Sequence, residues 1–272
     1  MALTEDKVII SNSITRLPSD PKGKVFVTGS HGGVYPGYLA AKLGVRAAVF
    51  NDAGLCKNSS AIGGLYYLEK IGIAAIAVSN MSAEIGNVKD VYENGIVSYM
   101  NRPAENVGCK VGMTCAEAVE KLTSAPLVGG NIVPSQENRH EIRSKYPRIV
   151  CMDSVSLVED GDWDAIVISG SHGALLGGSK PTALKHDAIA AFYNDAGFGK
   201  NNIAVTRLPA LDERGIIAGT VDSATAEIGN GLSTYEDGVL SCVNKCAEDA
   251  GARVGMRLKD FVAMLCERLE KK

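Results

Sequence analysis

Two of the chain's four histidines lie in the same tetrapeptide, Gly-Ser-His-Gly, which occurs once in each half of the sequence. Imidazole titrates near neutral pH, so His31 and His172 are candidates for a general acid or base, or for metal ligands. A turn that only satisfied its own backbone would more often use Asn, Asp or Pro. We therefore expect both histidines to be catalytic. The residues beside them that we expect to bind substrate are Ser30, Gly32, Ser171 and Gly173.

A second repeated motif, Asn-Asp-Ala-Gly-x-x-Lys-Asn, begins at residue 51 and again at residue 194. A lysine supplies a point charge for an anionic or carbonyl group, and backbone N–H groups near a helix start add donors. The alternative is that the aspartate only caps a helix and the lysine faces solvent. We expect catalytic roles for Asp52 and Asp195. The substrate-binding residues expected here are Asn51, Lys57, Asn194 and Lys200.

One position inside this motif differs between its two occurrences, because Cys56 corresponds to Gly199. A thiol near a helix N-terminus and beside a lysine can have a lowered pKa and act as a nucleophile. Cysteine also replaces glycine or alanine without any function. Cys56 is therefore a candidate nucleophile with a plain structural alternative.

The third motif is Ala-Glu-Ile-Gly-Asn, whose glutamates are Glu84 and Glu227. A carboxylate here can act as a base, pair with the lysine or hold a cation. The competing interpretation is a charged loop followed by a Gly-Asn turn. We expect both glutamates to be catalytic and Asn87 and Asn230 to bind substrate.

The motifs follow short apolar runs rich in β-branched residues, such as VIIS, VFVTG, AAVFN and IAAIAVS, which indicate buried strands. Helical segments separate the later runs, so the fold class is α/β with mostly parallel sheets built from βαβ units. One helix opens on Thr114 with Glu117 three residues later, a capping box. Ligands bind at the carboxyl edge of such sheets, so the histidine, aspartate and lysine of each copy should line one cavity. These residues are His31, Asp52 and Lys57 in the first copy and His172, Asp195 and Lys200 in the second.

The same motifs recur in the same order, with spacings of 141 residues for Gly-Ser-His-Gly and 143 for the others. This predicts a tandem duplication of units related by a pseudo-two-fold axis. The expected boundaries are a first repeat over 7–125, a linker over 126–147 and a second repeat over 148–272.

Composition excludes several classes of partner. The net charge is −3 and no long basic run occurs, so nucleic acid is not expected. The acidic N-terminal residues do not resemble a secretory signal and no segment has the length of a membrane span, so we expect a cytoplasmic protein. Seven cysteines without CxxC spacing indicate reduced core residues rather than zinc ligands. We expect a small-molecule substrate and a homo-oligomer, with no cofactor, although a divalent metal stays open.

Together these residues favour an enzyme acting on a small polar metabolite, specifically a hydrolase of an amide-like or other C–N bond. One alternative is a lyase or isomerase of a carboxylate-bearing metabolite, with or without a metal. Another is a non-catalytic ligand-binding or structural protein in which the motifs are only turns.

Overall fold

The computed structural model describes residues 6–16 and 20–271, which form two compact units. The first unit comprises the described residues up to Leu55, residues 59–136 and residues 199–201. The second comprises residues 56–58, residues 137–198 and the chain from residue 202 onward. Each unit therefore contains a short piece of the Asn-Asp-Ala-Gly-x-x-Lys-Asn motif from the opposite half of the chain. Lys57 belongs to the second unit and Lys200 to the first.

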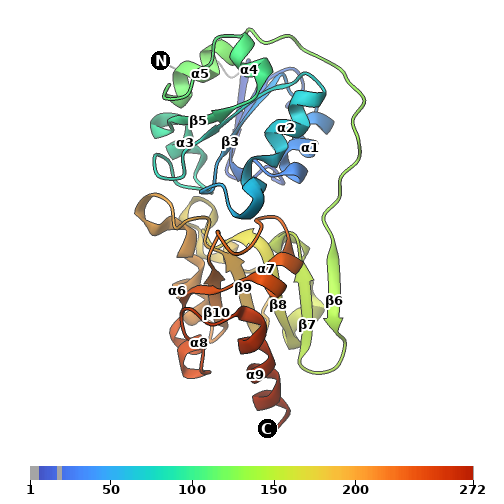
Figure 1. The fold of residues 1–272 in the computed structure, drawn as a ribbon, viewed down its shortest axis with the longest axis vertical. Helices are drawn as coiled ribbons and strands as arrows, with labels where there is room; N and C mark the ends of the chain where they lie inside the picture. The colour runs from blue at the N-terminus through green and yellow to red at the C-terminus, as the bar shows by residue number, and fades with distance from the viewer. Residues whose placement is uncertain (1–5, 17–19, 272) are drawn as a thin grey trace. The chain divides into compact units, whose positions relative to one another are not determined.

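The first unit is built on a five-stranded sheet in the order β1-β2-β3-β4-β5. Two of these strands, β3 and β5, are labelled in Figure 1. Its strands are β1 (Val8–Ser11), β2 (Val25–His31), β3 (Ala47–Asn51), β4 (Ala74–Val78) and β5 (Val97–Met100). The first four strands are parallel and β5 is antiparallel. The helices are α1 (Val34–Lys42), α2 (Gly63–Lys70), α3 (Val88–Asn94), α4 (Arg102–Asn106) and α5 (Cys115–Leu122). A 3₁₀ turn η1 (Lys57–Ile62), whose first two residues belong to the second unit, precedes α2.

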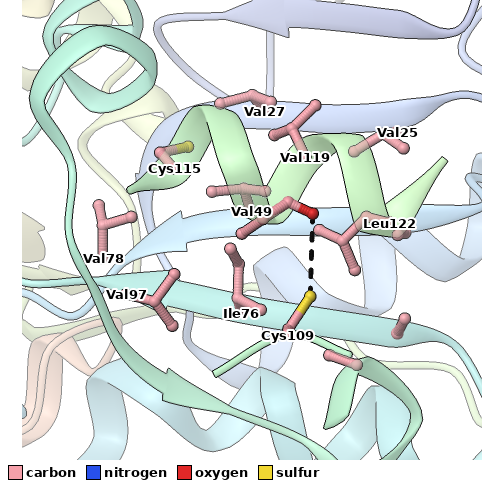
Figure 2. Packing of buried hydrophobic residues seen from close by; sticks show 14 of the residues in the cluster. Val25, Val27, Val49, Ile76, Val78, Val97, Cys109, Cys115, Val119 and Leu122 are labelled. Atoms are coloured by element: carbon pink, nitrogen blue, oxygen red, sulfur yellow. Dashed lines mark hydrogen bonds between the residues drawn. The ribbon is translucent and has the colours of Figure 1, made fainter. Parts of the chain in front are cut away.

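Helices cover both faces of this sheet. Val49 and Ile76 pack beneath α5 with Val119 (Figure 2), whereas Phe50 packs on the opposite side with Leu65 of α2. Burial on both faces explains why the parallel strands are apolar without alternation, as the sequence indicated.

The start of α5 confirms the predicted capping box. The Thr114 hydroxyl accepts a hydrogen bond from the Glu117 N–H, and the Glu117 carboxylate accepts one from the Thr114 N–H. Two donors that the helix cannot satisfy internally are thereby paired.

The second unit has a six-stranded sheet in the order β11-β10-β9-β8-β7-β6. Its strands are β6 (Arg139–Arg143), β7 (Arg148–Met152), β8 (Ala165–His172), β9 (Ala190–Asn194), β10 (Ile217–Val221) and β11 (Leu240–Val243). β7 to β10 are parallel, and β6 and β11 are antiparallel edges. The helices are α6 (Arg207–Asp212), α7 (Gly231–Asp237), α8 (Lys245–Asp249) and α9 (Leu258–Glu270). The 3₁₀ turns are η2 (Val155–Leu157), η3 (Asp160–Asp164), η4 (Leu176–Gly178), η5 (Lys180–Thr182) and η6 (Lys200–Val205), and the first two residues of η6 belong to the first unit.

Strand β6 lies inside the range 126–147 that the sequence assigned to a linker. Its side chains are mostly exposed and polar, which hides the apolar alternation of a strand. Its pairing with β7 comes from the backbone. Earlier in the same range, Val128 and Ile132 pack against the core of the first unit.

The units differ in how the segment after the histidine is held. In the first unit this segment is α1, and a Cβ added to Gly64 would lie 2.3 Å from the Gly33 carbonyl oxygen, so the close approach of α1 and α2 requires glycine. At the 143-residue spacing of the later motifs, the residue that corresponds to Gly64 is Arg207, whose exposed fraction is 2%. Its guanidinium donates to the Ala174 and Ala183 carbonyls, in a segment with only 3₁₀ turns.

Among the described residues, no helix combines the length and the apolar character needed to cross a membrane.

Candidate functional site

The two histidines stand on the last residues of β2 and β8 rather than in the loops that follow. The Nδ1 atom of His31 accepts a hydrogen bond from the Gly33 N–H at 3.1 Å, and that of His172 accepts one from the Ala174 N–H at 3.2 Å. Acceptance at Nδ1 leaves the ring proton on Nε2. Burial lowers the pKa of His31 to about 4, so at neutral pH this ring is an uncharged donor at Nε2 and its Nδ1 is not available as a base.

The motif serines hold the turns that follow β1 and β7. The Ser30 hydroxyl accepts a hydrogen bond from the Ile14 N–H at 3.0 Å. The Ser171 hydroxyl does the same for the Val155 N–H at 2.9 Å. Each serine therefore connects its own strand end to the neighbouring loop.

The motif glycines allow two backbone segments to pass at close range. A Cβ on Gly32 would lie 3.0 Å from the Ala61 carbonyl oxygen, and one on Gly173 would lie 2.3 Å from the Ala204 carbonyl oxygen. Side chains would displace these segments, which gives the glycines a packing role.

The motif asparagines are fully buried and bind the Ala-Glu-Ile-Gly-Asn loops. The Asn51 side-chain amide donates to the Ala83 carbonyl at 2.9 Å, and that of Asn194 donates to the Ala226 carbonyl at 3.1 Å. These hydrogen bonds connect the second motif to the third in each unit.

The motif aspartates are also surrounded by donors. Asp52 accepts hydrogen bonds from the Asn80 N–H at 2.8 Å and the Ser98 hydroxyl at 2.7 Å. Asp195 accepts one from the Ser223 N–H at 3.0 Å. Burial raises the pKa of Asp195, while its hydrogen bonds oppose that change. Both carboxylates position loops after neighbouring strands.

Cys56 is 8% exposed and has a left-handed backbone with φ 57°. Its Sγ donates to the Asn194 Oδ1 at 3.6 Å. The Lys57 ammonium, expected to activate this thiol, is ion-paired with Asp237. The geometry therefore favours a packing role for Cys56.

Chemistry-bearing side chains do gather in the second unit around Glu227. The Glu227 Oε1 accepts a hydrogen bond from the Asn58 side chain at 2.7 Å, and Oε2 accepts one from the Asn230 side chain at 2.9 Å. The Lys57 Nζ lies 3.0 Å from the Asp237 Oδ2. We call these five residues the Glu227 cluster.

The Glu227 cluster lines an open hollow of about 300 Å³. Its wall also includes Ser233, whose hydroxyl donates to the Asp237 Oδ2 at 2.9 Å. The hydrogen bonds from Lys57 and Ser233 hold the pKa of Asp237 below its usual range. The Glu227 cluster thus places one ammonium, two carboxylates and two amides beside a space that fits a small polar molecule, and the Glu236 carboxylate also lines this space.

The first unit has a corresponding set, which we call the Glu84 cluster. The Glu84 Oε1 accepts a hydrogen bond from the Asn201 side chain at 2.9 Å, and Oε2 accepts one from the Asn87 side chain at 2.9 Å. The Lys200 Nζ lies 2.7 Å from the Asp90 Oδ1. Lysine, glutamate and asparagine of the motifs are therefore brought together in both units.

The expected trio of His31, Asp52 and Lys57 is not assembled within one unit, because Lys57 belongs to the second. Sequence reasoning also missed the lysines' partners, Asp90 and Asp237. A signal existed, since VKDVYENG matches GLSTYEDG with its aspartate displaced by one helical turn. The asparagines after the lysines were missed as well, although they belong to the repeated motif.

Within residues 6–16 and 20–271, no group of three or more His, Cys, Asp or Glu side chains is arranged to hold a metal ion.

Comparison of the chain with protein-family models, curated proteins and solved structures finds no match.

Proposed function

We propose that this protein is a hydrolase that cleaves an amide-like C–N bond in a small polar metabolite, with the Glu227 cluster as its active site. The observation that carries the proposal is the hollow of about 300 Å³ beside a carboxylate, an ammonium and two amides. This volume is at the lower end for small-molecule sites, which favours a small substrate.

The chemistry follows from what each group can donate or accept. Glu227 accepts a proton from water, whose oxygen attacks the carbonyl carbon of the substrate. Lys57 has three N–H donors, of which one serves Asp237, and the others can stabilise the negative oxygen that develops. When the C–N bond breaks, the proton held by Glu227 passes to the leaving nitrogen. Water is consumed, and a carboxylic acid and an amine are formed.

Glu227 is chosen over the other candidate bases because of their surroundings. The Nδ1 atoms of His31 and His172 accept backbone hydrogen bonds, and Asp52 and Asp195 hold loops. Glu227 accepts one hydrogen bond from a side-chain amide at each oxygen, which leaves each a lone pair for water.

The test is hydrolysis of glycinamide, acetamide and urea in water enriched in ¹⁸O. Hydrolysis places one solvent oxygen in the product, which mass spectrometry detects and which an elimination or isomerisation does not produce. We expect E227Q to lower kcat by about 10² to 10⁴, the usual cost of losing a proton-transfer group. The matched control is E84Q, for which we expect less than about a tenfold change. Equal losses in the two variants, or no label in any product, would contradict the proposal.

A second candidate is a non-catalytic small-ligand-binding protein. The observation that favours it is the number of motif side chains that serve the backbone, including Asn51, Asn194 and both histidines. This candidate requires saturable binding of a probe in the hollow without turnover.

We also propose that the two units arose by tandem duplication. Support comes from the recurring motif order and from β1 to β5 and β7 to β11, each series having four parallel strands followed by an antiparallel one. An experimental structure in which the units had different strand orders would contradict this origin.

A further inference from the structure

The two clusters differ at two matched positions on the helix that follows the glutamate. In α3 these positions hold Asp90 and Asn94, and in α7 they hold Ser233 and Asp237. Positions four residues apart lie on the same face of a helix. The carboxylate that pairs with the lysine is therefore displaced by one turn between the units.

In the Glu84 cluster this carboxylate is saturated. Asp90 accepts two hydrogen bonds from Lys200, at 2.7 Å to Oδ1 and 3.0 Å to Oδ2. Oδ1 also accepts one from the Asn94 side chain at 2.8 Å, and Oδ2 accepts one from the Glu84 N–H at 2.7 Å. These four bonds fill the four lone-pair sites of a carboxylate, and the side chain is only 13% exposed.

In the Glu227 cluster the same tasks are divided between two residues. The Ser233 hydroxyl takes the backbone role, accepting a hydrogen bond from the Glu227 N–H at 3.1 Å. Asp237 takes the lysine, and its partners Lys57 and Ser233 both bind Oδ2. Hydrogen bonds from the described residues do not reach Oδ1 of Asp237, and its side chain is 43% exposed.

The charge around the hollow defines what can bind there. Its wall holds three carboxylates, those of Glu227, Glu236 and Asp237, and the ammonium of Lys57. Lys259 pairs with Glu236 at 2.5 Å, so one carboxylate charge stays in excess. A ligand with an ammonium group balances that charge and supplies donors to the open carboxylate oxygens.

We infer that the second unit binds an amine-bearing ligand between Asp237 and Glu227, that Ser233 and Asp237 are the residues that open this site, and that the Glu84 cluster is a closed structural counterpart. The inference rests on the proposed function in that it uses the same hollow. It adds the substrate class and assigns the site to one of the two clusters.

The experiment exchanges the two positions between the units and measures glycinamide affinity by ligand-observed NMR. We expect S233D/D237N to weaken glycinamide binding at least about tenfold, the effect of losing a hydrogen bond to a charged group. The mirror variant D90S/N94D is the matched control, and its affinity at the Glu227 cluster should stay within about twofold of wild type. Acetamide, which lacks the ammonium, should bind wild type at least about tenfold more weakly than glycinamide.

Thermal melts show whether S233D/D237N is folded. Its crystal structure should show Lys57 paired with residue 233, which verifies that the exchange closed the site as intended. Unchanged glycinamide affinity in a folded S233D/D237N protein would overturn the inference, as would equal affinity for acetamide. The hydrolase proposal is tested separately, by ¹⁸O incorporation into the product. Binding of glycinamide without ¹⁸O incorporation contradicts hydrolysis but supports the assigned site, whereas hydrolysis with unchanged S233D/D237N affinity does the reverse.

Discussion

Each motif histidine accepts a hydrogen bond from the backbone N–H two residues later, and this determines which ring nitrogen carries the proton. This hydrogen bond limits the acid–base chemistry that each histidine can perform. A neutral imidazole with its proton on Nε2 can donate to a ligand oxygen, but it cannot take a proton at Nδ1 without breaking that hydrogen bond.

The first prediction concerns the charge of His31. Its pKa in the folded protein is about 4, against about 6.5 in an unfolded chain. The unfolded state therefore binds more protons between these values, so the free energy of unfolding should fall as the pH drops from 6.5 to 4. We expect a loss of about 2 kcal/mol between pH 7 and pH 5.

Urea unfolding at pH 7 and pH 5 measures this loss, with H31N as the non-titrating control because its amide oxygen can still accept from the Gly33 N–H. Nitrogen chemical shifts of the ring should report the neutral Nε2–H form at pH 5. A charged ring at that pH would contradict the prediction.

At the scale of structural elements, the segment that follows the motif histidine has a different conformation in each unit. The first unit uses the helix α1 packed on Gly64, and the second uses 3₁₀ turns held by Arg207. The Arg207 guanidinium donates to three carbonyls and lies 5.1 Å from the centre of the Tyr193 ring. Buried carbonyls in irregular segments need such donors, because they have no helical partner.

The second prediction follows from this arrangement. Replacing Arg207 with Met should lower the free energy of unfolding by about 2–4 kcal/mol, since the Ala174 and Thr182 carbonyls lose their guanidinium donor and the Ala183 carbonyl keeps only the Tyr193 hydroxyl. R253M is the matched control, because the exposed Arg253 also donates to two carbonyls but at the surface. Its expected cost is below about 0.5 kcal/mol. Chemical denaturation of both variants measures the difference, and similar costs would show that burial of the carbonyls does not matter.

The third prediction concerns the edge strand β6. The fully buried Asp162 accepts hydrogen bonds from Arg139 of β6 and Arg148 of β7. Burial opposes ionisation of Asp162, but the hydrogen bonds from Arg139 and the Glu159 backbone and the charges of Arg139 and Arg148 together lower its pKa. D162N should therefore cost about 3–5 kcal/mol, because it leaves the Arg139 charge without its carboxylate partner, whereas Arg148 keeps Glu141 and Asp164.

The pH dependence gives a second measurement for Asp162. Its folded pKa is depressed, so its contribution is present above the unfolded pKa of about 3.9 and is lost as the pH falls through the folded value. Wild type and D162N should thus become more similar in unfolding free energy below pH 4. A constant difference down to the acid limit would contradict the assignment.

In the molecule as a whole, the units are not the two halves of the chain. Residues 56–58 belong with the second unit and residues 199–201 with the first. A substitution in one half therefore acts on the cluster of the opposite half, as Lys57 does at Asp237.

The fourth prediction uses the cysteines, which report on the packing of the entire described chain. No disulfide joins the seven, all of which lie in the described part, and five are buried. Burial raises the pKa of Cys115 and Cys151 to about 12, so their thiolates are scarce at pH 8. We expect at most two thiols, those of Cys242 and Cys246, to react rapidly with a thiol reagent at pH 8. All seven should react in guanidinium chloride, and rapid reaction of five or more in native protein would contradict this packing.

Local sequence patterns were sufficient for the α/β class, the four parallel strands of the first sheet and the cap of α5. These features depend on neighbouring residues, because burial on both faces selects apolar runs and a capping box spans four positions. They also placed the glutamates, lysines and asparagines of the motifs among the candidates for one site.

Only the tertiary structure decided which of these residues meet. The sequence predicted that Lys57 lines one cavity with His31 and Asp52, and the structure adds that its ammonium pairs with Asp237 in the second unit. A long lysine side chain can pair with any carboxylate that comes within its reach, and sequence spacing does not record which one the chain path brings there. Likewise, the motif does not reveal that Asp52 is committed to the Asn80 N–H. Buried backbone donors need partners, and the completed fold determines which side chain provides each one.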